Sequence, residues 1–187
     1  ALLPGLTAGR FDLAVSGITV TEERRETVLF SDAYYRSPIV MAVLADEPAT
    51  GGEKTLADFE NATLGILSGS SFDPLAKERF PNAQRQYYSL VPDMILAVEQ
   101  GKIDAYISET TYVAAAIWEG AKIETVDDVI DRTNAGYIFR KDSEGAAAVR
   151  EQLNAFIIKS KESGFLQELQ NKWLGSNHIS KNLIIYF

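Results

Sequence analysis

The residues that most clearly indicate a binding function lie in 12–35, DLAVSGITVTEERRETVLFSDAYY. There an arginine is predicted one turn into a short helix. Thr21 and the two glutamates after it begin a helical turn as a capping sequence does, and Arg24 lies in that turn. Its guanidinium is a planar fork of donors that matches a carboxylate, and Thr19 and the amides of the turn offer further donors. The grouping predicts an anion site. Ion pairing of Arg24 with a neighbouring acidic side chain is the alternative, and spacing alone does not choose between them.

A short strand places this turn. Leu13–Val15 is typical of a buried strand, and Ser16 and Gly17 are expected to leave it where the backbone approaches a ligand closely. A tight strand exit with no ligand is the other interpretation of that pair, and the two are compatible.

A serine-rich turn is the second candidate. Ser68-Gly69-Ser70-Ser71-Phe72 follows the apolar strand Leu64–Leu67 and opens a helix, where amides attract anions through the helix dipole. An ordinary N-cap explains the same residues. A phosphate loop is less well supported, because no Lys-Ser or Lys-Thr pair completes one.

A carboxylate after another strand is the third. Glu109 ends the strand predicted from Asp104, and ligands of open α/β sheets bind at the carboxyl ends of parallel strands. Glu109 is alternatively a helix-start residue that favours the dipole. Asp104 itself is assigned to the turn that enters the strand.

Composition excludes several classes of function. With 187 residues and 46% apolar content, the chain can bury the core of one larger domain or two small lobes. Its net charge of -8 disfavours nucleic acid and anionic membrane as partners. There is no cysteine, and His178 is the one histidine, so no metal, no cofactor and no catalytic residues are expected.

Neither end of the chain predicts a membrane span. No apolar run reaches the ~20 residues that cross a bilayer, and no basic start precedes an apolar stretch, so we interpret the chain as a mature or trimmed product. The closing Leu183–Phe187 is equally consistent with a pairing strand, a docked tail or the start of a truncated membrane segment.

Strand and helix patterns alternate through the middle of the chain and predict an α/β fold with a parallel sheet. Glycine-rich residues 46–54 follow an apolar strand and mark a boundary, and Gly164 separates two amphipathic helices near the end. The predicted strands are 11–15, 38–45, 62–67, 85–88, 104–107 and 135–139, and the predicted helices are 1–9, 72–79, 91–100, 144–163 and 165–174.

The spacing Thr19-x-Thr21-x-x-Arg24, followed by the run FSDAYY at 30–35, resembles the bacterial extracellular solute-binding proteins of family 3. The resemblance implies a periplasmic-binding-protein-like fold of type II, with two lobes, each with a mainly parallel sheet flanked by helices, and two hinge crossings. It implies a first part of lobe I at 1–45, lobe II at 46–134, and a return strand with the last helices of lobe I and the tail at 135–187. The family's first fifty or so residues have no counterpart here, so either part of lobe I is missing from this sequence or a second chain or segment completes it.

The same resemblance assigns roles to the candidate residues. Arg24 and the Ser70 and Ser71 turn would bind the carboxylate of an α-amino acid, with Thr19 and Gly17 beside them in lobe I. Glu109 would bind the ammonium; most members have Asp there, and the Glu also resembles glutamate-receptor ligand-binding cores. Further candidates are Ser16, through a backbone carbonyl, Leu67 and Ser108, where some relatives contact the ligand side chain, and Tyr112, as a cleft aromatic.

The family implies an extracytoplasmic protein, periplasmic or attached to the cell surface, that delivers an amino acid to the membrane permease of an ABC importer. One alternative is the amino-acid-sensing outer domain of a membrane signalling protein. A second alternative is a cyclohexadienyl-dehydratase-like enzyme in which an acidic residue such as Glu109 transfers protons.

Overall fold

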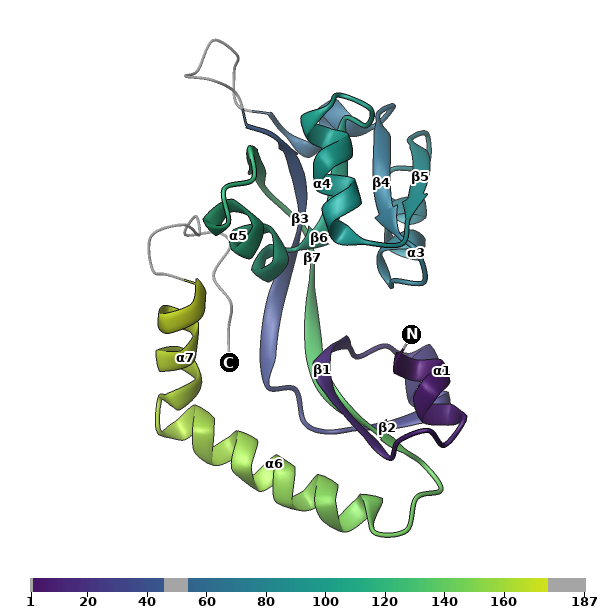
Figure 1. Cartoon of the computed structure of the whole chain (residues 1–187), viewed down its shortest axis with the longest axis vertical. Helices are drawn as coiled ribbons and strands as arrows, with labels where there is room; N and C mark the ends of the chain where they lie inside the picture. The colour runs from purple at the N-terminus through teal and green to yellow at the C-terminus, as the bar shows by residue number, and fades with distance from the viewer. Residues whose placement is uncertain (1, 46–53, 175–187) are drawn as a thin grey trace. The chain divides into compact units, whose positions relative to one another are not determined.

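The computed structural model describes residues 2–45 and 54–174, which fall into two compact units. Unit 1 holds 2–37 and 133–174, and unit 2 holds 38–45 and 54–132. Strands β3 (Tyr35–Leu44) and β7 (Ile123–Arg140) each run from one unit into the other (Figure 1). The glycine-rich turn, His178 and the apolar tail lie outside the described residues.

The divisions fall inside these two long strands, after Ser37 and after Arg132, whereas the predicted lobe limits are after residues 45 and 134. The apolar part of β3 belongs to unit 2 because Ile39, Met41 and Val43 are buried in its core.

Unit 2 is a mixed sheet with helices on both faces. The strand order is β7-β3-β6-β4-β5. Strand β4 (Thr63–Leu67) pairs in parallel with β5 (Gln84–Tyr88) and β6 (Ala105–Glu109), as the alternating pattern predicts, while β3 pairs antiparallel with β6. The remaining elements of unit 2 are the 3-10 helix η1 (Leu56–Phe59), α3 (Phe72–Arg79), α4 (Val91–Glu99) and α5 (Thr110–Trp118).

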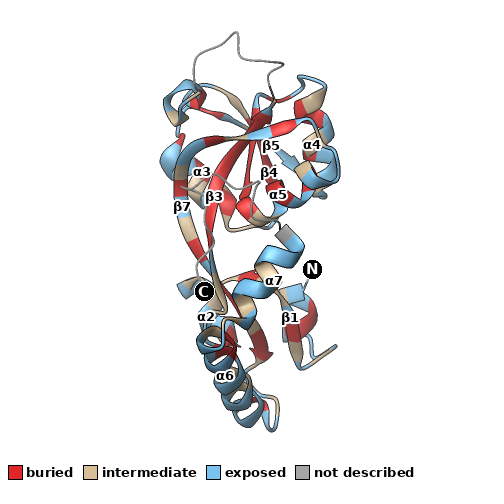
Figure 2. Ribbon diagram, turned by 90° about the vertical axis from the view of Figure 1, so that its left-hand side faces the viewer, coloured by how far each residue is buried: buried red, intermediate tan, exposed pale blue. Residues whose placement is uncertain are grey.

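Alternation along β3 divides the core of unit 2 into two layers. Ile39, Met41 and Val43 pack on the face that α3 covers, whereas Val40 and Ala42 pack on the face that α4 and α5 cover. Successive side chains of a strand point to opposite faces, so a strand covered on both faces is apolar at every position. Figure 2 shows these strands as buried.

Unit 1 is a smaller assembly around the second half of β7. Strands β1 (Leu13–Thr19) and β2 (Val28–Phe30) both pair antiparallel with β7. The α/β fold class is confirmed, but the mainly parallel sheet predicted for both lobes is wrong for these pairings, because β7 arrives from unit 2 and runs against both strands. The helices of unit 1 are α1 (Leu2–Thr7), α2 (Glu22–Thr27), α6 (Ala146–Glu162) and α7 (Phe165–Leu174).

Helix α6 is poorly covered by the described residues. Ile157 is its one large buried apolar side chain, while Val149, Phe156 and Ile158 are 43%, 52% and 49% exposed (Figure 2). Trp173 of α7, like Trp118 in unit 2, is 71% exposed, although large aromatic side chains usually pack in a core. Unit 1 therefore presents more apolar surface than its small core uses.

Candidate functional site

Arg24 lies where the sequence predicts, in the first turn of α2. Thr21 is the N-cap residue, and its hydroxyl accepts a hydrogen bond from the Arg24 amide at 3.2 Å. The side chain turns back toward β1, where Arg24 Nη1 donates to the Thr19 carbonyl oxygen at 3.0 Å. Thr19 and Arg24 are therefore in contact, and the bond fixes one corner of the guanidinium fork.

The guanidinium of Arg24 is half-buried. Desolvation lowers the pKa of Arg24, and the nearby Glu23 carboxylate opposes that shift. An arginine nevertheless remains charged at any physiological pH. A partly desolvated cation attracts an anion more strongly than one in bulk water, so this side chain has the electrostatics of a carboxylate-binding group.

Ser16 and Gly17 do not leave the strand, and that expectation is wrong. Strand β1 continues to Thr19, but its pairing with β7 shifts: Ala14 lies opposite Ile138, and Ile18 lies opposite Gly136. Three residues of β1, Val15 to Gly17, thus stand against one residue of β7. This register shift is a bulge, which locally disrupts the hydrogen-bonded ladder and is frequent near binding sites. The backbone at Ser16 and Gly17 is therefore irregular, although it remains within the strand.

The candidate residues of unit 2 meet at one edge of its sheet. Strands β4 and β6 are parallel neighbours, with Leu64 opposite Ala105 and Gly65 opposite Tyr106. Their carboxyl ends therefore lie side by side, which places Leu67 near Ser108. Leu67 is half-buried and packs against the α4 and α5 layer, while Ser108 is buried.

The serine turn joins β4 to α3. The Ser68 amide donates to the Tyr88 carbonyl oxygen at 2.8 Å, which ties the turn to β5, and the Ser70 amide donates to the Leu67 carbonyl oxygen at 3.1 Å. Ser70 Oγ accepts a hydrogen bond from the Phe72 amide at 3.3 Å. Ser71 is the N-cap residue of α3, but its side chain makes no capping hydrogen bond. The turn thus holds a half-buried serine hydroxyl at the start of a helix.

Glu109 ends β6 and is the N-cap residue of α5, with 2% of its surface exposed. Tyr112 lies one turn into α5 and is partly exposed. Burial raises the pKa of Tyr112, and the negative charge of Glu109 raises it further, so the two groups are close. Unit 2 therefore carries a carboxylate and the serine turn on the same sheet edge.

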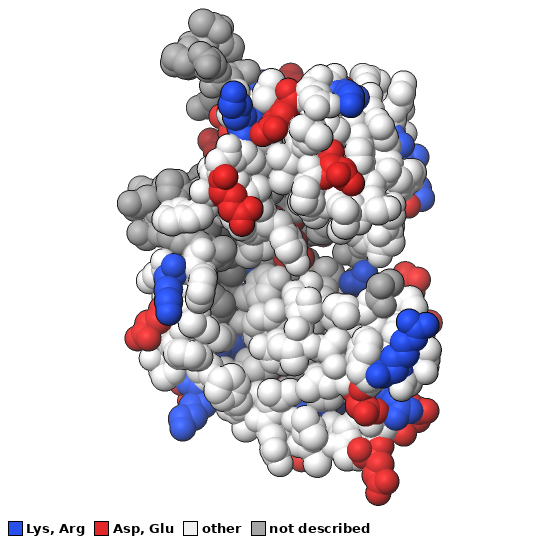
Figure 3. Space-filling model, viewed as in Figure 1, with Lys and Arg blue, Asp and Glu red and all other residues white. Residues whose placement is uncertain are grey.

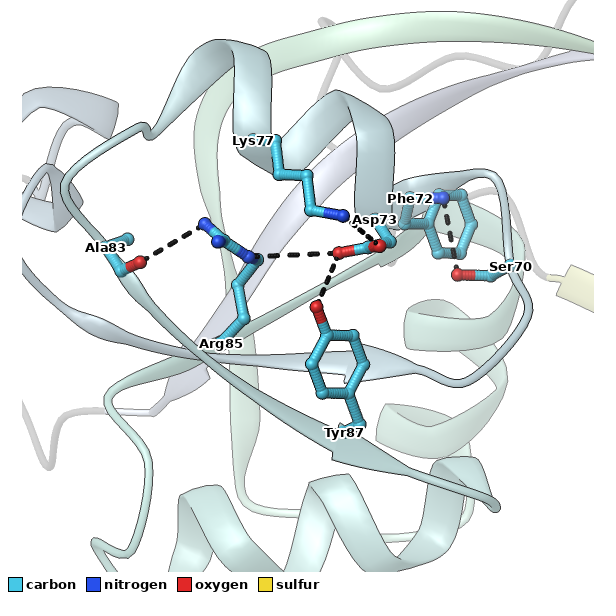
Figure 4. Close-up of polar contacts among 7 residues, drawn as sticks. All are labelled: Ser70, Phe72, Asp73, Lys77, Ala83, Arg85 and Tyr87. Carbon is cyan, nitrogen blue, oxygen red and sulfur yellow. Dashed lines mark hydrogen bonds and ion pairs between the residues drawn. The ribbon is translucent and has the colours of Figure 1, made fainter.

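Sequence reasoning missed an ionic cluster beside the serine turn. Asp73, in the first turn of α3, accepts hydrogen bonds from Lys77 Nζ at 2.7 Å and Tyr87 Oη at 2.8 Å, and Arg85 Nε lies 3.8 Å away (Figure 4). The four-residue spacing of Asp73 and Lys77 on a helix is a signal for that pair. The contacts with β5 leave no signal in the sequence.

Other features of the described residues do not add a site. A pocket of about 290 Å³ beside β7 is lined by Val43, Thr55 and Glu124 among others, and none of the predicted site residues is in its lining. The described parts of the chain hold no cluster of three metal-ligating acidic, histidine or cysteine side chains. Within residues 2–45 and 54–174, no helix has the length and apolar character of a membrane span. On the face in Figure 3, acidic and basic side chains are interspersed.

Comparison with known proteins identifies relatives of the whole chain. The family model of the bacterial extracellular solute-binding proteins, family 3, matches residues 1–176. The arginine-binding periplasmic protein of Mannheimia haemolytica is 28% identical over 183 residues, which cover 94% of this chain and 71% of that protein.

Two solved structures of amino-acid-binding proteins have the same fold. A binding component of an ABC transporter from Wolinella succinogenes DSM 1740, complexed with lysine, superposes with a TM-score of 0.81 at 25% identity, over 94% of this chain and 75% of that one. An amino acid ABC transporter substrate-binding protein from Streptococcus pneumoniae Canada MDR_19A, bound to L-arginine, superposes with a TM-score of 0.79 at 26% identity, over 95% and 73%.

Proposed function

The chain belongs to the bacterial extracellular solute-binding proteins of family 3, and from that premise we propose that it binds an α-amino acid outside the cytoplasm and delivers it to the permease of an ABC importer. The relatives named above bind arginine or lysine. A basic amino acid, with L-arginine first, is therefore the ligand to test.

The ligand's carboxylate has binding groups in each unit. Arg24 offers the edge of its guanidinium that does not contact Thr19. At the start of α3, the Ser71 amide and the Ser70 and Ser71 hydroxyls are further donors. Ser16, Gly17 and Thr19 contribute backbone or hydroxyl groups from the bulged strand and its end. Each of these groups suits an anion or the polar backbone part of an amino acid.

The ligand's ammonium is assigned to Glu109. The observation that carries the proposal is the shared carboxyl edge of β4 and β6, because it places a buried carboxylate beside the serine turn within one compact unit. An opposite charge lowers the cost of burying the ammonium. The other candidate residues at this edge carry no charge; they are Tyr112, Leu67 and Ser108. We therefore propose that this edge of unit 2 has no acidic partner for a cationic side chain of the ligand beyond Glu109.

We propose that the bound zwitterion shifts a conformational equilibrium of the protein. A ligand does so only through contacts that differ between the two states.

Two other functions remain to be separated from this one. The sensing domain of a membrane signalling protein would bind the same ligand, and a longer gene with an apolar run of ~20 residues after residue 187 would favour it. An enzyme of the cyclohexadienyl dehydratase kind would form product from prephenate or arogenate. The named relatives are binding proteins, and we propose that this chain is not an enzyme.

We further propose that a polypeptide segment outside residues 1–187 covers the apolar surface of α6 and completes unit 1. Val149 and Phe156 are exposed seven positions apart and so lie on one face of that helix, and exposed apolar groups on one face favour an interface. The Mannheimia haemolytica protein is longer, since the alignment covers 94% of this chain but 71% of that one. The longer relatives thus contain residues that have no counterpart here.

Calorimetry with purified protein tests the main proposal. The protein is titrated with L-arginine, with agmatine, which lacks the carboxylate, and with the deaminated analogue, which lacks the ammonium. Binding of L-arginine with a loss of at least ~10²-fold for each analogue is expected, because each loses a charge-assisted contact. If none of the twenty amino acids binds, or if agmatine binds as well as L-arginine, recognition of a zwitterion is refuted.

A further inference from the structure

Asp73 is the acidic side chain closest in sequence to the proposed carboxylate-binding turn. It is the second residue of α3, two positions after Ser71. A carboxylate in the first turn of a helix can accept hydrogen bonds from the amides there and is favoured by the helix dipole. Left to itself, the charged Asp73 carboxylate would repel the ligand's carboxylate from the turn.

The structure shows the Asp73 carboxylate engaged elsewhere. Lys77 Nζ, one turn further along α3, donates to one oxygen, and Tyr87 Oη, on β5, donates to the other. Arg85, also on β5, adds a second positive charge at 3.8 Å. Figure 4 shows all three side chains converging on Asp73, while Ser70 turns to the Phe72 amide.

Resting on the proposed function, we infer that Lys77 and Tyr87 are positioning residues that hold the Asp73 carboxylate against β5 and keep the Ser70–Ser71 turn open for the carboxylate of the ligand. Lys77 and Tyr87 therefore act on the ligand through Asp73 and need not touch it.

A purely stabilising role does not account for the arrangement. An exposed ion pair four residues apart on a helix adds only about 0.3–0.5 kcal/mol of stability, and the side chains of Lys77 and Asp73 are 54% and 25% exposed. Hydrogen bonding to Lys77 also lowers the pKa of Asp73, so the carboxylate is ionised at neutral pH. Its negative charge then attracts or repels whichever charged groups lie nearest.

The test compares Lys77→Met with the double variant Asp73→Asn/Lys77→Met. Lys77→Met removes the hydrogen bond and positive charge on one oxygen of Asp73 while Tyr87 and Arg85 remain at the other, so more negative charge is left next to the turn. The affinity for L-arginine is expected to fall roughly threefold to tenfold. The double variant removes that carboxylate as well, so its affinity is expected to return to within about twofold of the unaltered protein. Agmatine, which has no carboxylate, is expected to respond to neither change.

Lys102→Met is the matched control. Lys102 precedes β6, at the amino edge of the parallel strands and thus at the end of the sheet opposite the serine turn. The substitution removes the same charge from unit 2 and is expected to leave the affinity for L-arginine unchanged. Tyr87→Phe removes one donor to Asp73 and is expected to weaken binding in the same direction by a smaller factor, which gives a second measurement if Lys77→Met folds poorly.

Amide hydrogen exchange in the ligand-free protein, followed by NMR, tests the inference without a ligand. In Lys77→Met the added negative potential of the Asp73 carboxylate should slow base-catalysed exchange of the Ser71 amide, and in the double variant exchange should recover. The Ser70 amide already donates to the Leu67 carbonyl oxygen and serves as an internal reference. A double variant as weak as Lys77→Met would show that Lys77 attracts the ligand by its own charge, and the inference would be wrong. If no amino acid binds the unaltered protein, the proposed function fails, and unchanged amide exchange in Lys77→Met would independently overturn the inference.

Discussion

Replacement of Arg24 by methionine tests the predicted clamp most directly. Methionine keeps the length and helix preference of the side chain but removes the charge and all five N–H donors. In the structure one donor, Nη1, is engaged by the Thr19 carbonyl oxygen at 3.0 Å, so the opposite edge of the guanidinium has two parallel donors left for a ligand carboxylate.

The magnitude follows from those two donors. Hydrogen bonds to a charged group contribute roughly 1.5–3 kcal/mol each, so loss of the pair should weaken L-arginine binding by roughly 10²-fold to 10⁴-fold. Arg24→Lys keeps the charge but loses the fork, and an intermediate loss is expected. The free energy of unfolding should change by no more than about 1 kcal/mol, because Arg24 is half-buried and water can replace its bond to Thr19.

Arg25→Met is the control for this measurement. Arg25 follows in the same helix, pairs with Glu22 at 3.4 Å and lies over the Phe30 ring at 5.7 Å. Its removal takes away an equal charge one residue from Arg24 and should change the affinity by less than about twofold. Calorimetry on both variants decides the matter: equal affinities for Arg24→Met and Arg25→Met would refute the assignment of Arg24 to the ligand.

Four further predictions concern both units. Glu109→Gln should weaken L-arginine by roughly 10²-fold but its deaminated analogue far less, as measured by calorimetry, because only the amino acid offers an ammonium to that carboxylate; equal losses would move the ammonium site elsewhere. Tyr106→Phe should raise the free energy of unfolding by about 1 kcal/mol in urea denaturation, since the buried Tyr106 hydroxyl has no hydrogen-bond partner among the described residues, and a loss of stability would reveal a partner. Asp73→Asn should lower the melting temperature near neutral pH. Because the pKa of Asp73 is lowered in the folded state, the difference should be complete above the unfolded pKa of about 4 and should shrink as the pH falls through the lower pKa of the folded protein; a difference that stays undiminished at pH 2 would contradict the ionic role of Asp73. Phe156→Ser should reduce the fluorescence of an apolar dye in the 187-residue chain and any self-association seen by light scattering, and no change in either would mean that the α6 surface is not the exposed interface proposed here.

The elements bounded by local markers were predictable from the sequence. Helix α3 spans Phe72–Arg79 as predicted, after a serine turn, and α4 begins at Val91 with proline in its first turn. Gly164, at φ +76, separates α6 from α7 in a backbone conformation that favours glycine. In each case a single residue type imposes the boundary, so no tertiary information is needed.

The first half of β7 could not be predicted in the same way. Its buried residues are Ile123, Val126, Ile130 and Thr133, which recur every three or four positions rather than every second one. That spacing is typical of a helix, and only the pairing with distant strands makes the segment extended. The bulge in β1 is similar, since the residue of β7 that it faces lies more than a hundred positions away.

The candidate residues were found by type and spacing, but the chemistry of each depends on neighbours that spacing does not reveal. Asp73 and Tyr87 are fourteen positions apart, on a helix and a strand, and their hydrogen bond exists because β4 and β5 are parallel neighbours. A motif identifies which groups can bind charge, whereas the pairing of strands decides which of those groups are already occupied.

Gly65 shows how the core determines the geometry of the site in unit 2. A Cβ atom at Gly65 would lie 2.7 Å from Ile103 Cδ1 and 3.1 Å from the Tyr106 Cβ, so a larger residue there requires the Ile103 side chain to move and β4 to shift by a few tenths of an ångström from β6. Gly65 pairs directly with Tyr106 and precedes the serine turn on the same strand. Close packing at this one position therefore holds β4 against β6, and with it the distance between the serine turn and Glu109. A site that recognises two charges of a small ligand requires that distance to be constant, which gives a reason for a glycine between the buried Leu64 and Ile66 of this strand.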